Sequence, residues 1–182
     1  KGWANTLGAF VKTMKDQGVP LYALSAENEP DSGGMNGTTS FTKDEMATWI
    51  ADYLGPVLAD TGVKLMAPET MNWWSFPSYF TAIQNNRAAY DYVSIFASHQ
   101  YGRGPEVNAP DVVAANKAVT ADSSKEYWET EVDTGPTKDD PTADNMPSAL
   151  VLAETIHNDL TKANLNAFHY WWLYAGGSSG LF

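Results

Sequence analysis

The stretch that decides the fold is Leu21-Tyr-Ala-Leu-Ser-Ala-Glu-Asn-Glu-Pro30, in which a strand-like apolar segment ends abruptly in polar and acidic residues. A second strand-like segment, Lys125-Glu-Tyr-Trp-Glu-Thr-Glu-Val132, also ends in a carboxylate. Short apolar runs of this kind are typical of buried strands. Each of these two predicted strands therefore carries a glutamate, Glu29 or Glu131, at its C-terminal end.

Strand-like and helix-like segments alternate along the rest of the chain. Apolar spacing predicts helices over 5–17, 76–85, 110–121 and 148–163. A further helix is predicted from the capping box at Thr42–Glu45 to about residue 60, with a kink at Pro56. Strands are predicted over 21–27, 64–69, 92–98, 126–132 and 167–174, with polar loops over 31–40 and 136–147. This alternation indicates an α/β fold with a parallel sheet. The glycine-rich turn of nucleotide-binding sheets is missing from the sequence, which disfavours that class.

Polar and aromatic residues gather just after the predicted strands. Function concentrated at the C-terminal ends of strands is typical of (β/α)8 TIM barrels. The sequence predicts five strands, whereas a barrel has eight, and an unclosed barrel wall leaves two exposed edges. We therefore expect residues 1–182 to form one partial catalytic barrel domain that belongs to a longer protein.

Composition narrows the function. The chain has 182 residues, of which 43% are hydrophobic, and this suits one globular domain. Its net charge is −11, with 11 basic residues against 22 acidic ones, so nucleic acid is not an expected partner. It has no apolar run long enough to span a bilayer, and no membrane partner is expected. Cysteine is absent and no His/Asp/Glu spacing is typical of a metal site, so neither a metal nor a cofactor is expected.

Two carboxylates at the C-terminal ends of two buried strands are what a retaining glycosidase needs, with one as acid/base and the other as nucleophile. In that chemistry one of Glu29 and Glu131 is protonated before the attack and the other is ionised. Glu27 and Glu129 are the nearest competitors for these roles. Each lies two residues from a candidate and therefore on the same face of a regular strand.

Five segments in order resemble glycoside hydrolase family 30, a clan A family of retaining enzymes. They are Gln17-Gly-Val-Pro-Leu-Tyr-Ala-Leu-Ser-Ala-Glu-Asn-Glu-Pro-Asp31, Lys64-Leu-Met-Ala-Pro-Glu-Thr70, Ser98-His-Gln-Tyr-Gly102, Tyr127-Trp-Glu-Thr-Glu-Val132 and Phe168-His-Tyr-Trp-Trp-Leu-Tyr174. The resemblance implies that the chain holds barrel strands four to eight. We therefore expect the first three strands, the eighth helix and the side β-domain of the family to lie outside these residues.

The resemblance also implies a role for individual residues. Glu29 corresponds to the acid/base and Glu131 to the nucleophile, and the Asn-Glu-Pro and Glu-Val contexts favour them over their neighbours. Asn28 would hydrogen-bond the sugar 2-hydroxyl, Tyr101 would hold Glu131 in place, and Trp172 would line the floor of the sugar site.

Three further residues are candidates for substrate contacts, each with a structural alternative. His99 suits a substrate contact, or a satisfied core or rim histidine. Glu69 suits a substrate contact or a structural role. Trp74, with Trp73, suits either an aglycone platform or hydrophobic packing on a loop. Trp171 is expected to face away from Trp172, toward the helices.

The function expected from this resemblance is a retaining endo-β-1,4-xylanase that acts on a polysaccharide or oligosaccharide. The alternatives are an endo-β-1,6-galactanase or β-1,6-glucanase of the same family, and a catalytically silent carbohydrate-binding barrel. Some family 30 glucuronoxylanases carry an arginine after the eighth strand that grips a glucuronate branch. The corresponding stretch here, Tyr174-Ala-Gly-Gly-Ser-Ser-Gly180, has no arginine, which argues against glucuronate dependence. The N-terminal residues do not read as a signal peptide, so secretion is expected from the resemblance alone.

Overall fold

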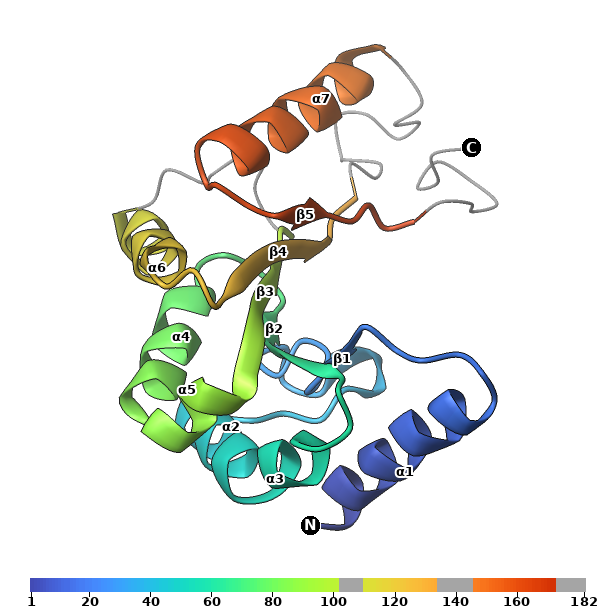
Figure 1. Ribbon diagram of the computed structural model, residues 1–182. Helices are drawn as coiled ribbons and strands as arrows, with labels where there is room; N and C mark the ends of the chain where they lie inside the picture. Colours follow the sequence, from blue (N-terminus) through green and yellow to red (C-terminus); the bar gives the residue numbers. More distant parts are fainter. Residues whose placement is uncertain (102–109, 134–145, 173–182) are drawn as a thin grey trace.

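The protein, described by a computed structural model over residues 1–101, 110–133 and 146–172, folds around one parallel sheet. Its five strands follow one another in chain order and each pairs with the next (Figure 1). They are β1 (Ala23–Ser25), β2 (Lys64–Thr70), β3 (Val93–His99), β4 (Glu126–Glu131) and β5 (Ala167–Phe168). Sequential parallel pairing of this kind is that of a barrel wall. The predicted fold, a partial TIM barrel, is confirmed.

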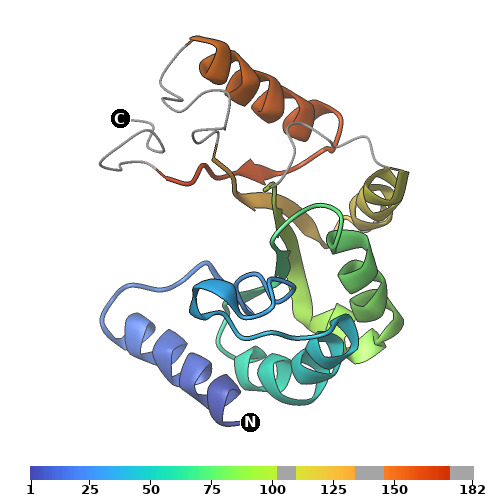
Figure 2. The ribbon, with the colours of Figure 1, turned by 180° about the vertical axis from the view of Figure 1, so that it is seen from behind.

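Helices connect the strands and lie outside the curved sheet (Figures 1 and 2). They are α1 (Gly2–Asp16), α2 (Lys43–Trp49), α3 (Gly55–Leu58), α4 (Phe76–Asn85), α5 (Arg87–Tyr92), α6 (Pro110–Ala121) and α7 (Met146–Thr161), with a 3-10 turn η1 (Met35–Gly37) and a π-helix η2 (Ile50–Leu54). Among the described residues, no helix combines the length and the apolar character needed to cross a bilayer.

The core lies between α4 and the middle strands. Phe76, Phe80 and Ile83 are buried at helical spacing on α4, and they face the buried Phe96 of β3 and Tyr127 of β4. The ring centroids of Phe80 and Phe96 are 4.9 Å apart. Burial of each such side chain contributes about 1.5–3 kcal/mol. This packing holds in place β3 and β4, whose ends carry His99 and Glu131.

The predicted helix from residue 42 forms, but its irregularity precedes Pro56. The capping box is present, since Thr42 Oγ1 accepts from Glu45 N and Glu45 Oε2 accepts from Thr42 N. Proline lacks an N–H and its ring crowds the carbonyl four residues earlier, so the helix cannot continue regularly. It widens into η2, in which Gly55 N–H donates to Ile50 O, before α3 begins.

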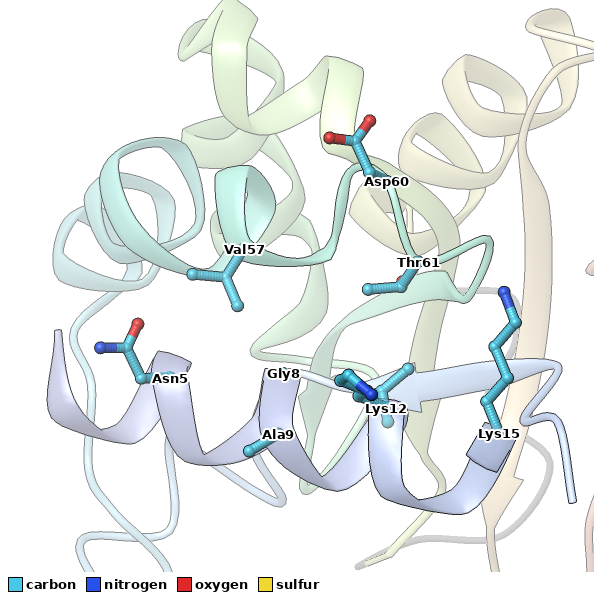
Figure 3. Close-up of a pocket in the computed structure, with 9 residues that line it drawn as sticks. Asn5, Gly8, Ala9, Lys12, Lys15, Val57, Asp60 and Thr61 are labelled. Carbon is cyan, nitrogen blue, oxygen red and sulfur yellow. The ribbon is translucent and has the colours of Figure 1, made fainter. Parts of the chain in front are cut away.

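Helix α1 packs across α3 and leaves a groove of about 480 Å³ beside the contact (Figure 3). Gly8 allows the close approach, because a Cβ at that position would lie 2.4 Å from Val57 Cγ1. Lys12 and Asp60 are among the residues that line this groove. None of the predicted site residues lines it, so the groove plays no part in the site described below.

Two helices differ from the predictions. Helix α5 was not predicted, and the strand that follows it begins at Val93 because Asn86 caps this extra turn by accepting from Ala89 N. Helix α7 starts at Met146, inside the predicted loop over 136–147, whose residues 136–145 lie outside the described residues. Its predicted apolar face (Ala149, Leu152, Ala153, Ile156, Leu160 and Ala163) is fully buried only at Ala163, which follows the end of the helix. Leu160 is 43% exposed, whereas Asp159 is fully buried.

The physical reason for the difference on α7 is that periodicity marks an apolar stripe without identifying its partner. Within α7, the residues that are buried are the polar Thr155, Asn158 and Asp159. The last strand is also shorter than predicted, since β5 ends at Phe168 and residues 173–174 of the predicted strand lie outside the described residues.

Candidate active site

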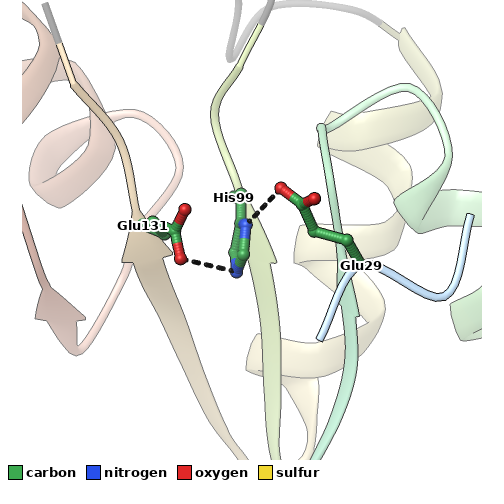
Figure 4. A group of neighbouring side chains, drawn as sticks. All are labelled: Glu29, His99 and Glu131. Atoms are coloured by element: carbon green, nitrogen blue, oxygen red, sulfur yellow. Dashed lines mark hydrogen bonds and ion pairs between the residues drawn. The ribbon is translucent and has the colours of Figure 1, made fainter. Parts of the chain in front are cut away.

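The two candidate glutamates meet at the C-terminal edge of the sheet, on either side of His99 (Figure 4). Glu29 follows β1, His99 ends β3 and Glu131 ends β4. His99 Nδ1 lies 3.1 Å from Glu29 Oε1, and His99 Nε2 lies 3.8 Å from Glu131 Oε2. One carboxylate oxygen of each glutamate and one histidine nitrogen all lie within 4.8 Å of one another. The fold thus brings together two acids that are distant in the sequence.

The backbone on the Glu29 side has an irregular geometry. Glu29 and Glu69 have φ angles of 46° and 59°, in the left-handed region that residues with a Cβ rarely adopt. Glu29 N–H donates to Glu69 O at 2.9 Å, and the register of β2 against β3 shifts between Pro68 and Thr70. Bulges of this kind turn side chains beside active sites, and rare φ values cluster there. The two irregular residues therefore support each other at the rim.

A second bulge lies beside Glu131. Ser98 pairs with Glu129 and His99 pairs with Glu131, so Thr130 is an extra residue in β4. In a regular strand Glu129 and Glu131 would share a face. Here Glu129 is fully buried, whereas Glu131 approaches His99 with a side chain that is 18% exposed. The bulge separates the two competitors that sequence spacing alone placed together.

Glu27, the competitor of Glu29, ties down the loop that follows β1. Its Oε1 accepts from Asn28 N at 3.3 Å and from Thr39 N at 3.4 Å. Asn28 itself is exposed, at the open end of the sheet, as a sugar contact requires.

Tyr101 donates a hydrogen bond of 2.7 Å to Glu131 Oε1, the contact expected from the sequence. Burial raises the pKa of Glu131, and the nearby Glu29 and Glu69 act in the same direction. The Tyr101 hydroxyl and His99 oppose this rise in the pKa of Glu131. Burial and the Glu131 charge also raise the pKa of Tyr101, so its hydroxyl keeps its proton and remains a donor.

Glu69 lies under the site with one oxygen paired. It is 6% exposed, and its Oε2 accepts from Ser25 Oγ at 3.0 Å. Its Oε1 is buried and has no hydrogen-bond partner within the described part of the chain. The hydrogen bond of Oε2 agrees with a structural role for Glu69, whereas a substrate contact would provide a partner for Oε1.

The structure separates the paired tryptophans after β2. Trp73 is 4% exposed and its ring packs against Phe76 and Tyr127, with centroid distances of 6.2 and 5.4 Å. The packing alternative therefore applies to Trp73. Trp74 is 53% exposed, and an aglycone platform requires an exposed side chain.

The tryptophans after β5 do not face opposite ways. The rings of Trp171 and Trp172 stack with a centroid distance of 4.5 Å, both are more than 40% exposed, and the peptide bond between them is cis. The expectation that Trp171 faces the helices is wrong, because it assumed strand alternation, and β5 ends at Phe168. The result is a paired aromatic surface.

The Glu29–His99–Glu131 group also has the donor types and spacing of a cation site among the described residues. Sequence spacing missed it because the three side chains come from three different strands. The signal that could have revealed the group was a histidine at the end of the strand between those of the two glutamates. The prediction that no metal is needed stays a prediction, for which a chelator test is given below.

A curved parallel sheet with facing carboxylates at its strand ends defines the chain as part of a TIM-barrel protein with an acidic site. Residues 1–159 match the Glycosyl hydrolase family 30 TIM-barrel domain, and the chain belongs to this family.

The curated relatives include glucuronoxylanase XynC of Bacillus subtilis, which is 30% identical over 171 residues. That match covers 94% of this chain but only 37% of the relative, so the chain spans little more than a third of its length. Lysosomal acid glucosylceramidase of Mus musculus is 30% identical over 105 residues, which cover 54% of this chain and 20% of the relative.

Solved structures show the same relationship. The family 30 subfamily 8 xylanase Xyn30A of Clostridium acetobutylicum superposes with a TM-score of 0.76 at 31% identity, over 100% of this chain and 41% of that one. The endo-β1,6-glucanase BT3312 superposes with a TM-score of 0.64 at 23% identity, over 86% of this chain and 35% of that one, which shows a shared fold.

Proposed function

We propose that the protein carrying this chain is a retaining glycoside hydrolase, with residues 1–182 as part of its catalytic barrel. The approach of Glu29 to Glu131, with oxygens within 4.8 Å across His99, is the observation that carries the proposal. Retaining enzymes hold their carboxyl groups about 5–5.5 Å apart, whereas inverting ones need about 6.5–9.5 Å to admit a water. The observed spacing favours retention.

In the proposed reaction, Glu29 donates its proton to the glycosidic oxygen while Glu131 attacks the anomeric carbon. The bond to the leaving sugar breaks and a covalent glycosyl-enzyme forms on Glu131. Glu29, now a carboxylate, then takes a proton from water, and the resulting oxygen nucleophile releases the sugar from Glu131 with the original configuration. Tyr101 holds the attacking carboxylate through its 2.7 Å hydrogen bond.

The substrate contacts follow the same scheme. Asn28 binds the sugar 2-hydroxyl at the exposed rim, and Trp172 offers the apolar ring face that a pyranose stacks on. Trp74 is the aglycone platform. Glu69 and His99 line the floor, where the free lone pairs of Glu69 Oε1 suit a sugar hydroxyl. His99 contacts both catalytic carboxylates, and we assign it to orienting them as well as the substrate.

We propose xylan as the polymer, because the relatives of at least 30% identity include a protein named as a glucuronoxylanase and one named as a xylanase. The stretch 174–180 lacks an arginine and lies outside the described residues, so neutral xylan is favoured over a glucuronate-directed cut. A silent carbohydrate-binding barrel is disfavoured because both glutamates are present. Action outside the cell on a polysaccharide, without nucleic acid or membrane partners, completes the proposal.

Product analysis with the full-length protein tests this proposal. We expect xylo-oligosaccharides from xylan and no cutting of β-1,6-galactan or β-1,6-glucan. The rate of hydrolysis should rise little when glucuronoxylan replaces xylan. Proton NMR should detect the β-anomer of the new reducing end first, and a chelator should leave the rate unchanged. Initial release of the α-anomer would exclude retention. Cutting of the galactan alone would exclude the xylanase assignment. Inactivation by the chelator would indicate a metal at the Glu29–His99–Glu131 group.

Tyr101→Phe is expected to lower kcat/KM about tenfold to a hundredfold, since a hydrogen bond to a charged group contributes about 1.5–3 kcal/mol. In the parent protein the hydrogen bond from Tyr101 favours the ionised form of Glu131, so the loss of this bond raises the pKa of Glu131 further. The nucleophile works only when ionised, and the acid limb of the pH profile of kcat/KM should therefore move to higher pH. Tyr53→Phe, at an exposed position on η2, is the control. An acid limb that stays in place would contradict this role of Tyr101.

A further inference from the structure

Glu129 is a fully buried acid that the proposed reaction does not use. It lies on β4, two residues before Glu131, and its exposed fraction is 0%. Its Oε1 accepts from Glu131 N at 3.1 Å, and its Oε2 has no hydrogen-bond partner in the ranges that the structure describes. The side chain therefore has one specific contact, and this contact is with the backbone of the proposed nucleophile.

The surroundings of Glu129 are acidic as well as buried. Asp159 on α7 is also fully buried, with both oxygens unpaired among the described residues, and burial raises the pKa of Asp159 to about 7. Burial first, then the charges of Asp159, Glu69 and Glu131, raise the pKa of Glu129 well above its usual range, although the hydrogen bond from Glu131 N opposes this rise. The buried hydroxyl of Tyr127 adds no positive charge. A neutral carboxyl fits these surroundings, and it accepts an N–H without placing a second negative charge beneath Glu131.

Stability alone does not account for an acid at this position. A buried carboxyl with an unpaired oxygen costs free energy, and an apolar side chain of similar size usually serves a core as well or better. Strained or costly groups of this kind are retained where a functional site requires them. The contact to Glu131 N is the feature of Glu129 that an apolar residue could not supply.

The bulge explains why that contact matters. Thr130 is the extra residue between the pairs Ser98–Glu129 and His99–Glu131. An extra residue disrupts the ladder locally and bends the strand, so the direction of the following side chain needs further support. The Glu129 carboxyl spans the bulge from one side, and Gln100 N–H donates to Glu131 O from the other at 3.0 Å.

We propose that Glu129 is a positioning residue for Glu131, and that its buried carboxyl holds the bulged backbone so that the Glu131 side chain faces Glu29, His99 and Tyr101. The inference rests on the proposed role of Glu131 as the nucleophile. A displacement of about 1 Å at a reacting group lowers rates by as much as a hundredfold. Loss of the contact should therefore lower kcat and leave KM nearly unchanged.

Three variants of Glu129 in the full-length protein test this on an aryl β-xylobioside. Glu129→Leu removes the carboxyl that accepts from Glu131 N. Glu129→Asp keeps a buried acid but shortens its reach by one methylene. In both variants kcat should fall about tenfold or more. Glu129→Gln keeps an acceptor oxygen at the same reach and should stay within about threefold of the parent. Tyr127→Phe removes another buried polar group from the same strand and is the matched control, with kcat expected to be unchanged.

A second background separates positioning from general support of the fold. In Glu131→Gly, azide can attack the anomeric carbon and displace the aryl oxide, and this nucleophile is not attached to the backbone. Glu129→Asp should then leave the azide-rescued rate unchanged. An equal loss in both backgrounds, or parent-like kcat in Glu129→Asp with Glu131 intact, would overturn the inference. Parent-like turnover of Glu131→Gly without azide would instead overturn the proposed function, whatever the effect of Glu129.

Discussion

Glu131→Ala is expected to abolish hydrolysis of xylan by the full-length protein, with kcat lower by about four orders of magnitude or more. Alanine provides no oxygen to attack the anomeric carbon, so no covalent intermediate forms. The proposed sugar contacts, the exposed Asn28 and Trp172, are not altered. Calorimetry should therefore still detect binding of xylo-oligosaccharides, because ground-state binding and transition-state stabilisation are separate quantities.

The control for this variant is Glu154→Ala, which removes an exposed acid of α7 and should leave kcat unchanged. A mass shift corresponding to one attached sugar, found on the parent with a slow fluorinated substrate and lost in Glu131→Ala, would support the covalent step directly. Undiminished turnover of the variant would remove Glu131 from the role of nucleophile. A loss of oligosaccharide binding together with turnover would indicate that Glu131 also binds the ground state.

Much of the fold follows from local sequence features. The bounds of α4 and α6 agree with the predicted helices over 76–85 and 110–121, because apolar spacing and prolines at the first turns define them. The capping box at Thr42 was equally visible in the sequence. The helix α5 was missed because its six residues are too few to give a periodic signal.

The site was predictable in its residues and not in its geometry. Strand ends marked Glu29, His99 and Glu131, and the resemblance to the family implied roles for the two glutamates. The bulges at Glu69 and Thr130 were not predictable, because a period of two residues assumes a regular strand. For the same reason, the sequence marked His99 at a strand end without giving its distances to the two acids.

The buried face of α7 shows a different kind of limit. An amphipathic pattern reports which side chains prefer burial, whereas the neighbours that bury them come from other parts of a barrel. Asp159 is buried against β4 although its residue type favours the surface, and it lies beside the equally buried Glu129. Buried acids of this kind contradict composition-based expectations, and such exceptions are expected near functional sites.

Glu29→Gln is expected to lower kcat/KM on xylan about a thousandfold or more, since a glutamine cannot protonate the departing sugar oxygen. The size of the loss should depend on the leaving group. A dinitrophenolate leaves without a proton, so an activated aryl xylobioside should still load Glu131 rapidly and show a burst of released phenol. The second step then lacks its base, and azide, which needs no base, should restore turnover and give a β-xylobiosyl azide. Glu27→Gln is the matched control, because Glu27 lies two residues away and holds the loop through Asn28 N and Thr39 N.

Equal losses on xylan and on the activated substrate would show that Glu29 acts in some way other than proton transfer. An azide product of the opposite anomeric form would show that the intermediate on Glu131 had not formed.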